Sequence, residues 1–233
     1  MKLELLDAYN IRARLSASII LLAPIAITTF LCFEKVNTLA TSTVFIFILL
    51  AFTNYIPLLQ RRFSQRKYCY ADYAIQLLLP SNTVIDGTTK NRYYKKLSRV
   101  DDSLKSFEQP NESDDFKRCC NSAVSFLKEA TRNNLHVQEE NINYGFCKNL
   151  MASKTFGIIL NSFLIVVISL YSYMCYDSFS SIPINNYFAL FANIVMLLFW
   201  IFGITQKMLE KSALYYAKTL LSKIDSLDIK TNA

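Results

Sequence analysis

The sequence predicts an all-α integral membrane protein. Two transmembrane helical hairpins, four spans in all, enclose a helical cytoplasmic domain, and an amphipathic helix forms the C-terminus. Three observations predict this fold: 52% of the 233 residues are apolar, these residues concentrate in four uncharged stretches, and the basic residues avoid two of the connecting loops. The expected division of the chain is an N-terminal cytoplasmic segment (1–15), a first transmembrane hairpin (16–59), a cytoplasmic helical domain (60–154), a second transmembrane hairpin (155–205) and a cytoplasmic C-terminal helix (206–233).

Four stretches contain no Asp, Glu, Lys, Arg or His. They are residues 16–33, 40–59, 155–174 and 185–205. About 20 apolar residues in a helix cross the hydrocarbon core of a bilayer, so each stretch is close to one span in length. A cleaved signal peptide is the alternative for the first stretch, but acidic residues precede it and no small-residue cleavage site follows.

The placement of Lys and Arg predicts the orientation. The loops 34–39 and 175–184 carry one basic residue between them, Lys35, and the other 24 of the 25 basic residues lie elsewhere. The positive-inside rule therefore places both termini and the central domain in the cytoplasm. The strongest anchor is the basic run at 61–67, directly after the second expected span.

Cysteine and histidine usage gives little support for metal or redox chemistry. Most of the six cysteines fall in expected cytoplasmic segments, where a disulfide framework is not expected. Cys32 and Cys175 lie near the outer face, where a pairing stays open. The single histidine, His136, is expected to be a partly buried turn residue, and no Gly-rich phosphate loop or nucleophile elbow is present. We expect no enzyme and no cofactor.

The central domain is too long for a loop and is expected to contain helices. Apolar residues recur at three- and four-residue steps within 63–79, 88–107 and 115–132, the spacing of one helix face. The first of these continues the second span and ends before Pro80. The tail at 206–227 repeats the pattern. It either packs onto the central domain or self-associates around an oligomer axis.

A dense basic segment lies in the second of these expected helices. It comprises Lys90, Arg92, Lys95, Lys96 and Arg99, with Tyr93 and Tyr94 interleaved. On a helix, four of the five basic residues share a face, which can hold phosphates while the tyrosines stack on bases. The alternative is a solvated face, or one that rests on anionic lipid headgroups.

Polar side chains also occur within the expected spans. The clearest are Asn161, Ser162, Ser169 and Asn193. Such groups face protein or water rather than lipid. They either join helices by hydrogen bonds worth roughly 1 kcal/mol each, or line a narrow pore with hydrophobic constrictions. A further turn is expected at Tyr144-Gly145-Phe146, where the glycine permits positive φ shortly before the third span. It is either a junction at which ligand state moves the pore helices or a packed turn that fixes the entry angle of the third span.

Three motifs occur in order along the chain. They are YNIRARL at 9–15, LPSNTVIDGTTKNRYYKKL at 79–97 and ENINYGFCKNL at 140–150. Together they resemble the motifs of a widespread family of bacterial four-helix membrane proteins, and the chain is similar to the channel-forming effectors of Hailong-type antiphage systems. Tyr94 stands where that family usually has His, Lys148 where it has Arg, and a Gly-rich Pro-Thr-Thr stretch is missing.

The resemblance implies a homo-oligomeric, tetrameric ion channel in lipid of the bacterial inner membrane. It further implies that a single-stranded DNA oligomer, made by a partner nucleotidyltransferase, holds the channel closed, and that its loss depolarises the cell in abortive infection. The implied ligand contacts are the basic segment, with both of its tyrosines, together with Tyr144, Phe146 and Lys148. A non-conducting membrane scaffold or sensor that recruits a cytoplasmic defence partner is the alternative function.

Overall fold

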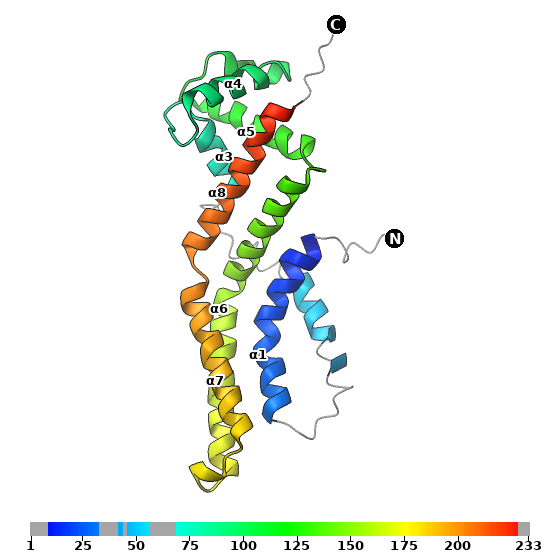
Figure 1. Ribbon diagram of the computed structural model, residues 1–233, viewed down its shortest axis with the longest axis vertical. Coiled ribbons are helices and arrows are strands. Elements are labelled where there is room, and N and C mark those ends of the chain that lie inside the picture. Colours follow the sequence, from blue (N-terminus) through cyan, green and yellow to red (C-terminus); the bar gives the residue numbers. More distant parts are fainter. Residues whose placement is uncertain (1–8, 33–41, 44–45, 56–68, 228–233) are drawn as a thin grey trace. The chain divides into compact units, whose positions relative to one another are not determined.

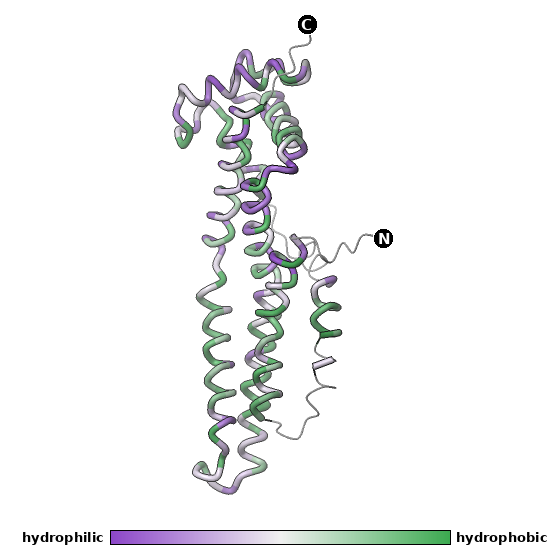
Figure 2. The backbone as a smooth tube through the Cα atoms, turned by 45° about the vertical axis from the view of Figure 1, so that its right-hand side comes forward, coloured by the Kyte–Doolittle hydropathy of each residue, from purple (hydrophilic) through white to green (hydrophobic). Residues whose placement is uncertain are grey.

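The computed structural model describes residues 9–32, 42–43, 46–55 and 69–227 (Figure 1). Over these ranges the chain is helical and holds no strand. The chain divides into two compact units, which we call the apolar unit (Met1–Ser64 and Gly145–Met208) and the polar unit (Gln65–Tyr144 and Leu209–Ala233). Figure 2 shows hydrophobic residues along most of the helices of the apolar unit and a mixed pattern in the polar unit.

The described residues contain three helices that are long and apolar enough to cross a membrane. They are Asn10–Cys32, Leu135–Cys175 and Ile184–Gly203, and a shorter apolar helix covers Ile46–Tyr55. These helices agree with the first, third and fourth expected spans. The second expected span is described only in part, and the loop at 34–39, the basic run at 61–67 and the last residues of the tail lie outside the described residues.

In the apolar unit, each of the two π-helices is continuous with a neighbouring α-helix. Its elements are the π-helix η2 (Asn10–Leu15), α1 (Ser16–Cys32), the second part of α6 (Leu135–Cys175), the 3₁₀ turn η5 (Phe179–Ser181), α7 (Ile184–Leu198) and the π-helix η6 (Phe199–Gly203). Helix α1 packs along α7. Pro24 lies inside α1, which stays a single helix.

The expected turn at Tyr144-Gly145-Phe146 is wrong, because α6 is one continuous helix of 41 residues that passes through it. Gly145 has no positive φ. A Cβ atom at Gly145 would lie 2.5 Å from the Oη atom of Tyr9, so the glycine provides space for that ring. One turn further on, the fully buried Asn149 donates from Nδ2 to the carbonyl oxygen of Ala13 at 2.8 Å. The first and third motifs therefore meet in the apolar unit.

Trp200 forms the centre of the apolar core. It is fully buried in a cluster with Ala17, Leu21, Leu150 and Ile204. On α6, Gly157 admits the indole closely, since a Cβ there would lie 2.4 Å from Cε2 of Trp200. At both glycines of α6 an aromatic side chain therefore packs directly onto the helix backbone, in the way that small residues admit close packing in membrane bundles.

Lys154 caps the end of η6. Its Nζ atom donates to the carbonyl oxygens of Ile201 at 3.0 Å and Ile204 at 2.7 Å. The last carbonyls of a helix lack partners within the helix and carry partial negative charge, so a lysine is favourable there. This contact fixes the point at which the chain leaves η6 relative to α6.

The polar unit is built from short helices around aromatic side chains. Its elements are α3 (Tyr70–Leu78), α4 (Gly87–Leu97), the 3₁₀ helix η4 (Asp102–Glu108), α5 (Asp114–Ala130), the first part of α6, α8 (Gln206–Ser222) from Leu209 onward and the 3₁₀ turn η7 (Lys223–Ser226). Helices α3 and α5 agree with the first and third helices expected in this domain, within the described residues. The expected single helix at 88–107 is wrong, because Asp101 accepts from the backbone N–H of Ser103 and starts a new helix after α4.

The C-terminal helix packs within the polar unit. Tyr216 of α8 lies against Tyr70 and Tyr144, with ring centroids 4.5 and 6.1 Å away. The apolar face of α8 is buried at Leu209, Ala213, Ala217, Leu220 and Leu221. Of the two alternatives for the tail, packing onto the central domain is therefore the one that the structure shows. The same face is not available for self-association.

Replacing Gly145 by alanine tests the contact with Tyr9. Alanine is the better helix former by about 1 kcal/mol, so propensity alone predicts stabilisation. We expect the opposite, a net loss of roughly 1–2 kcal/mol, because the added methyl overlaps the Tyr9 ring and overpacking costs about 1–3 kcal/mol. Thermal unfolding in detergent, followed by circular dichroism, measures the change.

Gly87→Ala is the matched control, since a Cβ at Gly87 meets nothing within 4 Å. It is expected to leave Tm unchanged or to raise it slightly. In the double variant with Tyr9→Ala, the penalty of Gly145→Ala should largely disappear. Equal Tm values for the two alanine variants would refute this role for Gly145.

Candidate functional site

The basic segment lies on α4 of the polar unit. Asp86 caps the helix by accepting from the backbone N–H of Thr89 at 2.9 Å. Five basic residues and no acidic residue lie between Gly87 and Arg99. Only part of this positive charge faces outward, because α4 packs one of its faces into the core.

Both tyrosines of the segment belong to the core of the polar unit. Tyr93 is 6% and Tyr94 5% exposed. The Oη atom of Tyr94 donates to the carbonyl oxygen of Leu78 at 2.6 Å, and its ring stacks on Phe107. Burial raises the pKa of the Tyr94 phenol above its usual range. The expectation that these rings stack on bases does not fit this placement, since neither ring face is open.

Lys90 is also buried, at 4% exposure. Its ammonium donates to the carbonyl oxygens of Leu79, at 2.8 Å, and of Asn82. Burial lowers the pKa of Lys90, while the nearby carboxylate of Glu112 acts in the opposite direction. Glu112 in turn accepts from the backbone N–H of Ser81 at 2.9 Å. Lys90 thus stabilises the turn between α3 and α4 and is not placed to contact a ligand.

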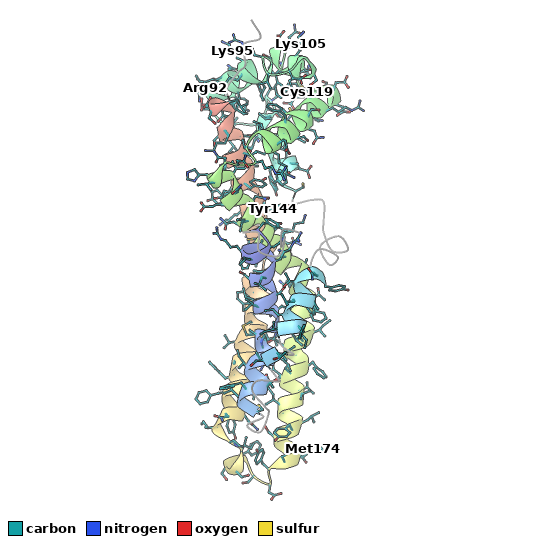
Figure 3. All side chains as sticks on the ribbon, turned by 90° about the vertical axis from the view of Figure 1, so that its right-hand side faces the viewer. Arg92, Lys95, Lys105, Cys119, Tyr144 and Met174 are labelled. Atoms are coloured by element: carbon teal, nitrogen blue, oxygen red, sulfur yellow. The ribbon has the colours of Figure 1, made fainter. Side chains whose placement is uncertain are left out.

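What we call the basic face consists of Arg92, Lys95 and Lys96 on α4, and of Arg99 in the turn that follows the helix. Lys95 and Arg99 are exposed. Arg92 forms a two-pronged ion pair with Asp225 of η7, from Nε at 2.8 Å and Nη2 at 2.7 Å. Lys96 donates to the backbone carbonyl oxygen of the same aspartate. Figure 3 labels Arg92 and Lys95 on this helix.

The other expected ligand contacts are divided between the two units. Tyr144 is 7% exposed and packs against Tyr70 and Tyr216 in the polar unit. Phe146 packs against the Trp200 cluster of the apolar unit. Lys148, which is half-buried, also belongs to the apolar unit. The structure therefore does not assign these three residues to the basic face.

The polar residues of the expected spans separate into two groups. Asn161 and Asn193 are fully buried. Asn161 donates to the carbonyl oxygen of Gly157 at 2.7 Å, and Asn193 donates to Thr28 Oγ1 at 2.8 Å, which joins α7 to α1. Asn193 therefore connects helices within the chain. Both asparagines face the inside of the bundle rather than a pore.

Ser162 and Ser169 lie on the exposed surface of α6. They belong to a regular row, the α6 seam, with steps of four and three residues: Thr155, Ile159, Ser162, Val166, Ser169 and Tyr173. Hydroxyl side chains alternate with larger ones, of which Ile159 is 61% and Val166 54% exposed. The spacing is visible in the sequence, but the structure is needed to show which face of α6 the described residues leave exposed.

Metal and thiol chemistry gain no support from the described ranges. They contain no group of three or more His, Cys, Asp or Glu residues able to hold a metal ion. Cys32 and Cys175 are free thiols. His136 is exposed near the start of α6, so its expected partial burial in a turn is wrong. Comparison with protein-family models, curated proteins and solved structures finds no match to this chain.

Replacing Lys90 by methionine tests its structural role. The change removes the donor from two carbonyl oxygens, and leaving buried polar groups unsatisfied costs about 1–3 kcal/mol. Lys105→Met, at an exposed position, is the control and should stay within about 0.5 kcal/mol of the parent. Denaturant unfolding measures both variants. A Lys90 variant as stable as the Lys105 variant would contradict the assignment.

Proposed function

We propose that this chain is the membrane effector of a bacterial antiphage defence system. It forms a homo-oligomeric, gated ion channel in the inner membrane, with four spans and both termini in the cytoplasm. A cytoplasmic nucleic-acid ligand, a DNA oligomer made by a partner nucleotidyltransferase, holds it closed, and its release depolarises the cell. The motif resemblance supports the defence role, and the α6 seam is the single observation that carries the pore.

The seam has the composition that a pore-facing helix needs. Steps of four and three residues allow helices from several copies to pack at a shallow angle. The β-branched residues Ile159 and Val166 share one position of this repeat, and the small residues Ser162 and Ser169 share the other. Ser162 and Ser169 would form hydroxyl rings, and Ile159 and Val166 hydrophobic rings that close by excluding water. Ser169 satisfies its hydroxyl within the helix, at 2.8 Å from the carbonyl oxygen of Ile165.

Bulky residues follow the neighbouring strip of the same helix. Phe163 and Leu170, seven residues apart, are 62% and 55% exposed. Large apolar side chains are well solvated by lipid tails, whereas small hydroxyl side chains favour contact with protein or water. The difference between the two strips supports an axis along the seam and lipid against Phe163.

The ligand would act through the basic face of α4. Lys95 and Arg99 are exposed there, and phosphates bind to such positive surfaces with a strong dependence on salt. Helix α6 belongs to both units, with Leu135–Tyr144 in the polar unit and the seam in the apolar unit. Helix α6 thus contributes residues both to the unit that carries the basic face and to the proposed pore.

A non-conducting scaffold is the second candidate function. One observation favours it: hydrogen bonds already join the spans within one chain, such as Thr53 Oγ1 to Ser18 Oγ at 3.3 Å. A bundle satisfied in this way needs no further copies. Expression of the chain without its partner separates the two functions, because only a pore depolarises the membrane.

Leucine substitution in the seam tests the pore. In cells that express the chain alone, Ser162→Leu and Ser169→Leu should abolish most of the depolarisation reported by a potential-sensitive dye. The larger apolar side chains would replace the hydroxyl rings by further hydrophobic constrictions.

Phe163→Leu, at the adjacent exposed position, is the matched control and should depolarise like the parent. Equal amounts of each variant in the membrane fraction, with equal Tm in detergent, exclude misfolding. If both seam variants conduct like the parent, α6 does not line the pore. If the parent itself leaves the membrane potential unchanged without its partner, the result favours the scaffold function.

A further inference from the structure

The carboxylate of Asp225 occupies the basic face in this structure. Both of its oxygens accept from the guanidinium of Arg92, and its backbone carbonyl accepts from Lys96. These contacts join η7, near the C-terminus, to a helix more than one hundred residues earlier in the chain. Figure 3 shows Arg92 in the part of the polar unit where α8 ends.

The geometry of this contact is that of anion recognition. A guanidinium presents parallel N–H groups that fit two oxygens of a carboxylate or of a phosphate equally well. The nearest acidic residue before α4, Asp86, is engaged at the helix cap by Thr89. The charge of Asp86 also acts on Arg92, but Asp225 is the acidic residue that hydrogen-bonds to both Arg92 and Lys96.

We propose that Arg92 and Lys96 form a phosphate-binding site, and that Asp225 occupies it as an internal substitute that a phosphate-bearing ligand displaces. The inference deepens the proposed function and rests on it for the nature of the ligand. It adds the residues at which exchange occurs and makes the C-terminal segment a competitor of the ligand.

The internal contact is weak enough to exchange. The side chain of Arg92 is 52% and that of Asp225 38% exposed, and ion pairs in such positions are screened by water. A phosphate chain carries more charge than one carboxylate and extends to Lys95 and Arg99 on the same face. Ile224, next to Asp225, is fully buried, so the carboxylate can leave while η7 stays anchored.

Acid is not the signal that releases Asp225. Hydrogen bonding and charge from Arg92, with the charge of Lys96, hold the pKa of Asp225 below its usual range, against a smaller opposing effect of burial. A carboxyl whose pKa is lowered in the folded state contributes stability above its unfolded pKa and loses it as the pH falls through the folded value. At neutral pH the contact is fully charged. Displacement therefore requires a competing anion.

Binding of defined probes to the full chain in detergent tests the exchange. The probes are a short single-stranded DNA oligomer and inorganic pyrophosphate. Asp225→Asn should tighten binding of both by about two- to fivefold, because the internal competitor is removed. Arg92→Gln should weaken DNA binding and reduce its salt slope by about one. In the double variant, loss of Asp225 should bring no gain.

Asp115→Asn is the matched control. It removes the same charge from the polar unit, at a residue whose own ion pair, with Arg118 at 3.6 Å, lies within α5. Nanodiscs with anionic or with zwitterionic lipid distinguish the source of the phosphate. If Asp225→Asn tightens binding to anionic discs but has no effect on the soluble probes, the site is assigned to lipid headgroups.

The results separate this inference from the proposed function. If Asp225→Asn behaves like Asp115→Asn with both soluble probes and with anionic lipid, or if neither probe nor anionic lipid binds, the exchange is refuted even where the parent depolarises cells. If Asp225→Asn binds more tightly while the parent leaves the membrane potential unchanged, the exchange stands and the pore is refuted.

Discussion

The close approach of helices at small residues is the constraint on which the rest of the structure depends. The N-terminal helix reaches α6 only because Gly145 leaves room for Tyr9, and the carbonyl of Ala13 then meets Asn149. Trp200 reaches the core because Gly157 has no side chain. Between helices in lipid there is no hydrophobic effect, so a bundle in a membrane would depend on such packing and on buried hydrogen bonds. The bundle is therefore specified by a few positions, two of them glycines.

These inward contacts determine what the outer surface of α6 is left to do. Asn161 and Gly157 face the bundle, which turns Ser162 and the rest of the seam away from it. Ser162 and Ser169 lie next to the bulky strip at Phe163, on the surface of α6 that the described residues leave exposed. The proposal that further copies pack along the seam rests on this arrangement.

The sequence predicts this fold unevenly, and the reasons are physical. Charge-free stretches and helical periodicity are local, so three of the expected spans and two of the expected short helices agree with the structure. The break after α4 comes from Asp101, whose side chain caps a new helix in a segment that still has helical periodicity. The sequence does not predict the roles of Gly145 and Lys90, because their partners, Tyr9 and the carbonyl of Leu79, are set by tertiary packing. A glycine that admits a distant ring and a glycine that permits a turn look alike in one sequence.

The two proposed sites are joined by continuous elements of the chain. Helix α8 leads from Asp225 at the far end of η7 back to Gln206, two residues after Ile204. Ile204 accepts from Lys154, which directly precedes Thr155, the first residue of the seam. Along the chain, η7 and α8 thus lead from Asp225 to the contact between Ile204 and Lys154, the residue that precedes the seam.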